Sequence, residues 1–258
     1  MSARETVTSR DMTHADAAFA RRALPLLDLT DLTDACTEAA VATLCAKARA
    51  STVAAVCVWP RFVAQARHEL AGSDVRVATV INFPKGGDDV ARAVEDTAKA
   101  LRDGADEIDL VLPYPAFLRG ETGPARTMIE AVRGLCDGGR LLKVILETGE
   151  LETPDAIAGA SRLALEAGAD FLKTSTGKSP VSATPEAART MLRIIHAHGE
   201  ARPAGIKISG GLRSIRDAAP YLALADEIMG PGWAGPATFR FGASSLHADL
   251  VAALGEGT

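Results

Sequence analysis

Four ionisable residues occur inside short apolar runs that have the alternating pattern of buried β-strands. They are Asp109 in the run 106–112, Lys143 in 141–147, Lys173 in 170–175 and Lys207 in 204–209. Because successive side chains of a strand point to opposite faces, the apolar residues of each run would share one face and the ionisable residue would lie on the other. Burying a charge is costly unless the charge is paired or functional. Three inward lysines with the acids Asp109 and Glu147 therefore favour an active site, with a purely structural ion-pair network as the alternative.

Two of these lysines, Lys173 and Lys207, are expected on neighbouring strands at nearly equal depth. A lysine amine attacks a carbonyl carbon only in its neutral form, and its reference pKa is about 10.4. A second lysine nearby and partial burial both disfavour the charged form. The pair thus predicts an amine nucleophile that forms a Schiff base, with Asp109 able to transfer protons directly or through water.

The cysteines and histidines do not have the spacing of metal ligands. The four cysteines, Cys36, Cys45, Cys57 and Cys136, are scattered without a CxxC motif and are expected to be reduced and partly buried. The five histidines, His14, His68, His196, His198 and His247, fall mostly in expected helices or in the N-terminal tail. We therefore predict no metal and no cofactor.

Three glycine- or serine-rich turns follow the late apolar runs, at 174–179, 209–214 and 242–245. Glycine lets backbone N–H groups approach an anion closely, and Lys178 and Arg213 carry the positive charge to neutralise it. Ser244 and Ser245 are expected to open a helix. Each turn alone could be an ordinary turn or helix cap, but together they predict a phosphate site.

Apolar runs alternate with alanine-rich amphipathic segments from about residue 50 onward. The runs lie near 52–58, 75–81, 106–112, 141–147, 170–175, 204–209, 225–229 and 239–243. Eight strands alternating with helices predict parallel pairing in an α/β fold, a single (β/α)8 TIM barrel, whose active sites lie at the carboxyl ends of the strands. A doubly wound open sheet is the alternative, but the first run ends Cys57-Val58-Trp59-Pro60 without the usual glycine-rich turn.

The ends of the chain and its charge limit the function further. We expect one barrel domain over residues 23–258, preceded by a flexible extension over 1–22 that leads into an extra N-terminal helical segment. The extension lacks the apolar core of a signal peptide, and no apolar run reaches the length of a membrane helix. The formal net charge is -5, so no basic excess indicates nucleic acid or an anionic membrane as a partner.

Eight segments form a combination that is typical of one family. They are LLDLT at 26–30, AAVCVWPRF at 54–62, VATVINFPKG at 77–86, GADEIDLVLPY at 104–114, LLKVILETGEL at 141–151, GADFLKTSTGK at 168–178, IKISGGLR at 206–213 and RFGASSL at 240–246. The order FLKTSTGK and then IKISGG is hard to obtain by chance. From about Leu26 to Leu254 the chain resembles the 2-deoxyribose-5-phosphate aldolases, which are class I aldolases.

The resemblance implies a cofactor-free (β/α)8 barrel that reversibly cleaves 2-deoxy-D-ribose 5-phosphate to acetaldehyde and D-glyceraldehyde 3-phosphate. It assigns the Schiff base to Lys173, pKa tuning and proton relay to Lys207, and proton transfer to Asp109. The implied phosphate ligands are Gly177, Lys178, Gly210, Gly211, Gly242, Ser244 and Ser245. It also places Asp28, Cys57 and Lys143 near the site. Family members are cytoplasmic, are often dimers or tetramers, and serve deoxynucleoside breakdown.

Two departures and two rival functions accompany the resemblance. Some members use a C-terminal tyrosine for proton transfer, whereas this sequence ends Leu254-Gly-Glu-Gly-Thr258, and an N-terminal extension is atypical. One rival is a related Schiff-base barrel that acts on another sugar phosphate or a ketose. The other is a non-catalytic phosphosugar-binding barrel, which should lack the paired lysines.

Overall fold

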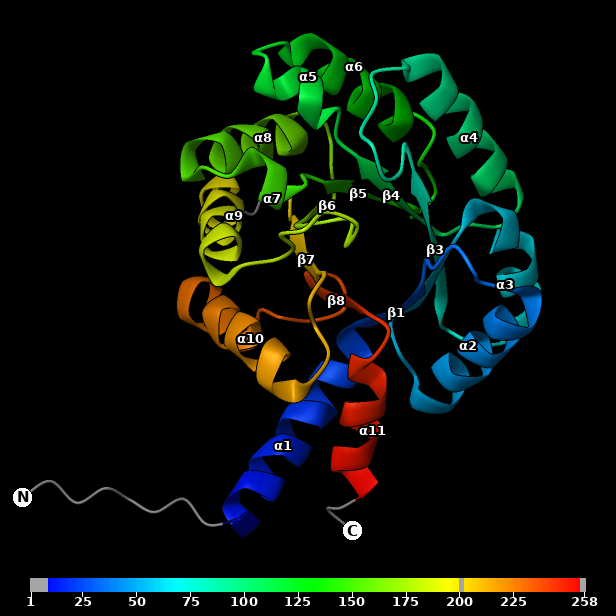
Figure 1. Ribbon diagram of the computed structural model, residues 1–258, viewed down its shortest axis with the longest axis vertical. Coiled ribbons are helices and arrows are strands. Elements are labelled where there is room, and N and C mark those ends of the chain that lie inside the picture. Colours follow the sequence, from blue (N-terminus) through cyan, green and yellow to red (C-terminus); the bar gives the residue numbers. More distant parts are fainter. Residues whose placement is uncertain (1–8, 200–201, 256–258) are drawn as a thin grey trace, which may run out of the picture.

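The computed structural model describes residues 9–199 and 202–255, with side chains from His14 onward. Eight parallel strands pair in sequence order and close into a barrel through β1 and β8, and the helices form an outer ring (Figure 1). The strands are β1 (Leu27–Asp31), β2 (Ala55–Val58), β3 (Arg76–Ile81), β4 (Glu107–Val111), β5 (Leu141–Ile145), β6 (Phe171–Lys173), β7 (Gly205–Ser209) and β8 (Phe239–Ala243). The predicted (β/α)8 barrel is confirmed, and an open sheet is excluded because both edges are paired.

The helices alternate with these strands, apart from one at the N-terminus. They are α1 (Ser9–Ala23), α2 (Glu38–Ser51), α3 (Val63–Glu69), α4 (Val90–Arg102), α5 (Tyr114–Leu118), α6 (Thr122–Arg133), α7 (Thr148–Leu151), α8 (Pro154–Glu166), α9 (Pro185–His198), α10 (Ile215–Met229) and α11 (Leu246–Gly255), with short 3₁₀ turns at Leu24–Leu26 and Pro60–Phe62. No helix among the described residues is long and apolar enough to cross a membrane.

The predicted strand assignment is wrong at two places. Residues 225–229 form the last turn of α10 rather than a strand, because Leu222 and Ala225 continue the buried face of that helix. The strand that completes the barrel is instead β1, at Leu27–Asp31, whose apolar run is interrupted by Asp28 and Asp31. The segment 225–229 is about one helical turn long, and over that length a strand and a helix end have similar patterns.

Side chains alternate between the two faces of the barrel wall as the sequence predicts. Outward residues such as Ile108 and Leu110 are fully buried against the helices in the main hydrophobic core. Inside the barrel a smaller apolar cluster covers the β2–β3 side, made of Leu32, Ala55, Cys57, Ala78 and Val80. The ionisable inward residues come from the remaining strands, so one side of the lumen is apolar and the other is charged.

The loops before two helices are fixed by side-chain caps. Thr184 accepts a hydrogen bond from the backbone N–H of Ala187 at the start of α9. Ser214 and Asp217 form a reciprocal capping box at the start of α10. These caps anchor the carboxyl-terminal ends of the loops that follow β6 and β7, where the sequence predicts phosphate ligands.

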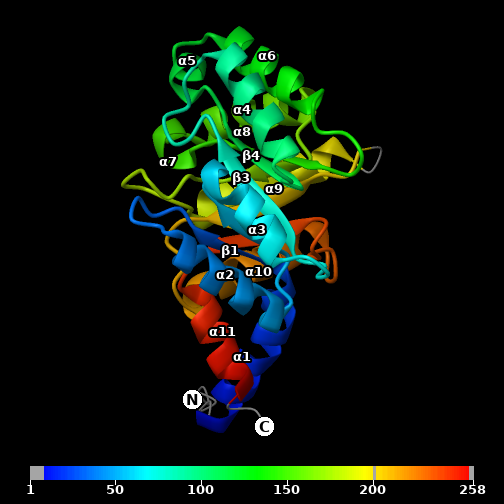
Figure 2. The same ribbon diagram turned by 90° about the vertical axis from the view of Figure 1, so that its right-hand side faces the viewer.

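The N-terminal helix α1 lies beside the last helix α11, below the barrel in both views (Figures 1 and 2). Arg22 at the end of α1 forms a two-pronged ion pair with Asp226 of α10. The predicted N-terminal helical segment is therefore confirmed. Residues 1–8 of the expected flexible extension lie outside the described residues, and the division between residues 22 and 23 stays a prediction.

A close contact between the adjacent strands β6 and β7 can be tested by its effect on stability. Gly205 on β7 lies opposite Phe171 on β6, and a Cβ at Gly205 would come within 2.4 Å of the Phe171 ring. Gly205→Ala is therefore expected to lower the free energy of unfolding by about 1–3 kcal/mol through overpacking. Gly123→Ala in α6 is the control, since its Cβ would meet nothing within 4 Å. Urea unfolding of both variants checks this, and equal stabilities would contradict it.

Candidate active site

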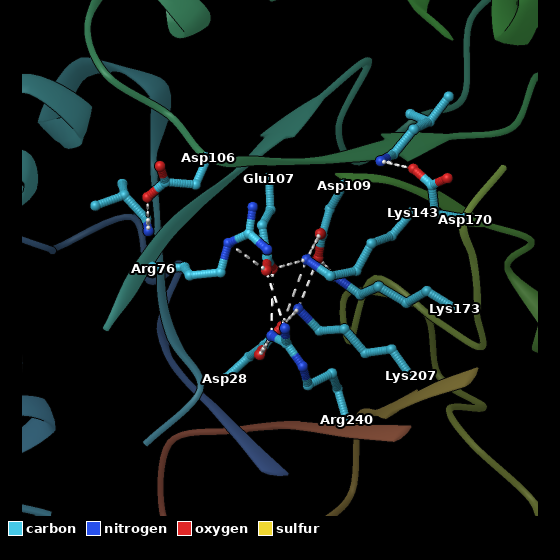
Figure 3. Close-up of polar contacts among 12 residues, drawn as sticks. Asp28, Arg76, Asp106, Glu107, Asp109, Lys143, Asp170, Lys173, Lys207 and Arg240 are labelled. Atoms are coloured by element: carbon cyan, nitrogen blue, oxygen red, sulfur yellow. Dashed lines mark hydrogen bonds and ion pairs between the residues drawn. The ribbon is translucent and has the colours of Figure 1, made fainter. Parts of the chain in front are cut away.

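Seven ionisable side chains from six strands converge inside the barrel (Figure 3). They are Asp28 on β1, Glu107 and Asp109 on β4, Lys143 on β5, Lys173 on β6, Lys207 on β7 and Arg240 on β8. None is more than 3% exposed. The register places Asp109 opposite Lys143, and Lys173 opposite Lys207. The structure thus brings together Asp109, Lys173 and Lys207, as the sequence predicts.

Asp109 is the centre of this cluster because all three lysines contact its carboxylate. Its Oδ1 accepts a hydrogen bond from Lys143 Nζ at 2.9 Å. Its Oδ2 accepts from Lys173 Nζ and from Lys207 Nζ, each at 2.8 Å. Burial by itself would raise the pKa of Asp109, but the three ammonium groups hold that pKa well below its usual range. Asp109 is therefore ionised at neutral pH.

The cluster holds more bases than carboxylates. Lys143 contacts all three carboxylates, those of Asp28, Glu107 and Asp109. Lys207 Nζ lies 2.6 Å from Asp28 and 2.8 Å from Asp109. Arg240 lies 2.6 Å from Asp28 and 3.0 Å from Glu107. Among the described residues, Lys173 has an ion-pair contact with Asp109 alone, and Asp109 is already shared with two other cations. Lys173 is therefore the base that the carboxylates compensate least.

The two paired lysines consequently shift in opposite directions. Burial and the charge of Lys207 lower the pKa of Lys173, against the opposing effect of Asp109. Burial would also lower the pKa of Lys207, but Asp109 and Asp28 raise it. At neutral pH Lys173 is thus the amine that most readily loses its proton, while Lys207 stays charged beside it. A neutral amine next to an ionised carboxylate is the arrangement that attack on a carbonyl requires.

Lys173 opens onto a pocket of about 820 Å³ at the carboxyl ends of the strands. All seven residues predicted as phosphate ligands also line this pocket: Gly177, Lys178, Gly210, Gly211, Gly242, Ser244 and Ser245. Gly242 also makes room for the lysine cluster, since a Cβ there would come within 2.9 Å of Lys207 Cε. The pocket therefore joins the least compensated amine to three glycine- and serine-rich loops.

Glu147 contacts the loop that follows β6. It is 2% exposed, precedes α7 in a left-handed conformation with φ 57°, and contacts Thr176 through its carboxylate. Thr176 donates its hydroxyl to Glu147 Oε2 at 2.5 Å and accepts a hydrogen bond from the backbone N–H of Lys178 at 3.0 Å. Lys178 itself is partly exposed, with Nζ 3.6 Å from Asp34 and 5.9 Å from the centre of the Trp59 ring. Glu147 thus fixes the loop that carries Gly177 and Lys178.

Two members of the cluster, Glu107 and Arg240, were missed in the sequence although a signal was present. Glu107 lies two residues before Asp109 and so shares its face, and Arg240 lies between the outward Phe239 and Phe241. Asp28 was indicated only by the resemblance, because β1 was not recognised as a strand. The alternation of faces therefore marks both residues as inward once it is extended to every position of β4 and β8.

All four cysteines are buried and free. Cys57 lies in the lumen, where burial raises the pKa of its thiol. Within residues 9–199 and 202–255, no group of three or more His, Cys, Asp or Glu side chains could hold a metal ion.

The surplus of bases has a consequence for stability. Because the folded-state pKa of Lys173 lies below its unfolded value, this lysine disfavours folding at every pH below that unfolded value of about 10.4. Lys173→Met is therefore expected to raise the free energy of unfolding at pH 7 by about 1 kcal/mol. The opposite holds for Lys207, whose folded-state pKa is raised. Lys207→Met should lower the free energy of unfolding by about 3–5 kcal/mol.

Urea unfolding at pH 7 measures both changes. A matched lysine-to-methionine pair removes the same atoms from neighbouring positions of the lumen, so hydrophobic differences largely cancel. Equal destabilisation of the two variants would show that Lys173 is as well compensated as Lys207.

The sequence and the fold of this chain are similar to those of known aldolases. The model of the DeoC/LacD family aldolases matches residues 21–250. A curated deoxyribose-phosphate aldolase of Agrobacterium fabrum is 51% identical over 238 residues, which cover 91% of each chain. The apo structure of a putative deoxyribose-phosphate aldolase from Toxoplasma gondii ME49 is 28% identical with a TM-score of 0.86, covering 95% of this chain and 100% of that one. A putative deoxyribose-phosphate aldolase structure from Coccidioides immitis is 31% identical with a TM-score of 0.78, covering 89% and 85%. Because the family model matches most of its length and a curated aldolase is 51% identical to it, this chain belongs to the DeoC/LacD family of aldolases.

Proposed function

We propose that this protein reversibly cleaves 2-deoxy-D-ribose 5-phosphate to acetaldehyde and D-glyceraldehyde 3-phosphate through a Schiff base on Lys173. The observation that carries the proposal is that Lys173, the least compensated base of the cluster, opens onto the pocket lined by the three loops. The 51% identity to a protein named deoxyribose-phosphate aldolase supports the choice of substrate. The reaction would place the protein in the breakdown of deoxynucleosides.

The chemistry follows from the neutral amine. Lys173 Nζ attacks the C1 aldehyde of the open-chain sugar, and loss of water with uptake of one proton, delivered through Asp109 or a water beside it, gives a protonated Schiff base. Removal of the proton from the C3 hydroxyl breaks the C2–C3 bond and releases glyceraldehyde 3-phosphate, with the electron pair passing into an enamine. Protonation of C2 and hydrolysis then release acetaldehyde and restore the amine.

Asp109 and Lys207 would manage the protons and charge of these steps. Asp109 Oδ2 lies 2.8 Å from both Lys173 Nζ and Lys207 Nζ, so a proton can pass along this chain of groups or through a water beside it. Lys207 stays protonated and disfavours a second positive charge on free Lys173. The carbon–carbon bond is broken above them, at the open end of the lumen.

The three loops would hold the phosphate. The ligand set that we propose is Gly177, Lys178, Gly210, Gly211, Gly242, Ser244 and Ser245. Gly177, Gly210 and Gly211 have positive φ angles of 77°, 90° and 82°, which turn their backbones tightly at the pocket. Ser244 and Ser245 precede α11, where backbone N–H groups are free to bind an anion.

The assembly, the location and the domain boundary are further parts of the proposal. We propose one aldolase domain over residues 23–258, acting in the cytoplasm as a homodimer or homotetramer on small phosphorylated sugars and aldehydes. The support is the resemblance to the aldolase family. Sedimentation velocity measures the oligomeric state.

Borohydride reduction in the presence of acetaldehyde tests the central claim. The expected result is one reduced adduct on Lys173, found by peptide mass mapping, together with loss of cleavage of 2-deoxyribose 5-phosphate. Lys173→Met should abolish both the adduct and the cleavage. An adduct on Lys143 or Lys207 in the unmodified protein would overturn the assignment of the nucleophile.

Negative charge introduced just before α11 tests the phosphate site. Ser244→Asp with Ser245→Asp is expected to raise the apparent KM for 2-deoxyribose 5-phosphate at least tenfold, since a charge-assisted contact of about 1.5–3 kcal/mol becomes a repulsion. Cleavage of unphosphorylated 2-deoxyribose should change far less.

The matched control is the double change to alanine at Ser244 and Ser245. It keeps the backbone N–H donors and adds no charge, so its KM should lie near that of the unmodified protein. Equal losses on the phosphorylated and unphosphorylated sugars would contradict a phosphate site at these loops.

A further inference from the structure

Arg240 lies at the base of the cluster and takes no part in the proposed reaction. It is 2% exposed, and its guanidinium lies 5.7 Å from the centre of the Phe171 ring. Its Nη1 donates to Asp28 Oδ1 at 2.6 Å, its Nη2 donates to Glu107 Oε1 at 3.0 Å, and its Nε donates to the backbone carbonyl of Pro236 at 2.6 Å. All three guanidinium nitrogens of Arg240 thus donate hydrogen bonds. Two of the acceptors, Asp28 and Glu107, also form ion pairs with lysines.

The two carboxylates beneath Arg240 connect it to the reactive end of the cluster. Asp28 also contacts Lys207, and Glu107 also contacts Lys143. Both lysines in turn contact Asp109, the partner of Lys173. A charge at Arg240 is therefore linked to Lys173 through an unbroken series of buried ion pairs, in which the dielectric screening is weak.

The permanence of the arginine charge is what separates it from the lysines. A guanidinium does not deprotonate in proteins, whereas a buried lysine shifts its pKa readily. Burial would lower the pKa of Arg240, but Asp28 and Glu107 raise it. In return, the charges of Arg240 and the lysines lower the pKa values of these two acids and keep them ionised. If a neutral side chain replaced Arg240, Asp28 and Glu107 would pair more fully with Lys143 and Lys207, apart from the contact of Glu107 with Arg76, and Asp109 would be left more fully to Lys173.

We propose that Arg240 is a positioning residue that favours the neutral form of Lys173, because its fixed positive charge occupies Asp28 and Glu107 at the closed end of the lumen. The inference rests on the proposed role of Lys173 as nucleophile. Arg240 touches neither the substrate pocket nor Lys173 and acts through the charge count of the cluster. The groups that face it or its carboxylate partners are Asp28 and Glu107, then Lys143 and Lys207, and Arg76 of β3, whose Nε lies 3.2 Å from Glu107.

The groups around Lys173 come from three other strands. Asp109 of β4 contacts it directly, Lys207 of β7 lies opposite it, and the Cys57 thiol of β2 lies near enough to affect its charge. Asp109 is the one carboxylate among them. The protonation of Lys173 therefore depends on how far other cations satisfy Asp109, which is what a change at Arg240 would alter.

The test measures the protonation of Lys173 without relying on turnover. The folded protein is acetylated with a trace of acetic anhydride from pH 6 to pH 10, and the reactivity of Lys173 is compared with that of exposed Lys85 by peptide mass mapping. Arg240→Gln is expected to move the titration midpoint of Lys173 to higher pH by about one unit. Each unit corresponds to about a tenfold smaller neutral fraction in the acid range.

Three further variants separate a charge effect from structural damage. Arg240→Lys restores a cation and should return the midpoint toward that of the unmodified protein. Arg76→Gln also removes a cation from Glu107, but the Arg76 side chain is 33% exposed. Because solvent screens that charge, the shift of the Lys173 midpoint should be smaller than in Arg240→Gln. Glu107→Gln removes a negative charge and should move the midpoint to lower pH.

The double variant Glu107→Gln with Arg240→Gln carries the test if the single arginine variant does not fold. It removes one charge of each sign, so its Lys173 midpoint should lie close to that of the unmodified protein and above that of Glu107→Gln. An unchanged midpoint in Arg240→Gln, or in the double variant relative to Glu107→Gln, would overturn the inference. Failure of the proposed function is distinguished by trapping, because it would leave unmodified Lys173 without an acetaldehyde adduct.

Discussion

The Asp109 carboxylate, shared by three lysine amines within 2.9 Å, is the interaction on which the site depends. One carboxylate cannot neutralise three ammonium groups in a buried place, so the remaining compensation must come from Asp28 and Glu107. Those two acids are divided among Lys143, Lys207 and Arg240. Lys173 is left with the smallest share, and its proposed role as the nucleophile rests on that shortage rather than on a dedicated base.

The closed barrel buries this cluster almost completely. None of its seven side chains is more than 3% exposed, which strengthens each ion pair but also makes any uncompensated charge expensive. The cost is borne by the apolar wall outside the strands, where residues such as Ile108 and Leu110 are fully buried against helices. Because six of the eight strands each contribute one or two of the buried charges, the barrel wall fixes the geometry of the cluster.

The lumen therefore has two ends with different physical properties. The lower end, around Arg240 and Glu107, is sealed and fixes the distribution of charge. The upper end, from Lys173 to the loops after β6, β7 and β8, is open to a pocket that can admit a phosphorylated sugar. Glu147 and Gly242 lie at the junction, where the first shapes a loop and the second leaves room for Lys207. The ion pairs of Arg240 thus lie at the closed end of the lumen, whereas Lys173 faces the pocket at the open end.

Alternation along single strands was enough to predict a (β/α)8 barrel and the inward positions of Asp109, Lys143, Lys173 and Lys207, because that pattern is local and repeats every two residues. The same rule would have found Glu107 and Arg240. It did not mark β1, whose five residues include two aspartates, and it could not separate the last turn of a helix from a strand at 225–229. Which carboxylate compensates which base was decided only by the tertiary structure. Asp28 and Arg240 are 212 positions apart and meet because β1 pairs with β8 to close the barrel, and a pattern within one strand carries no information about that pairing.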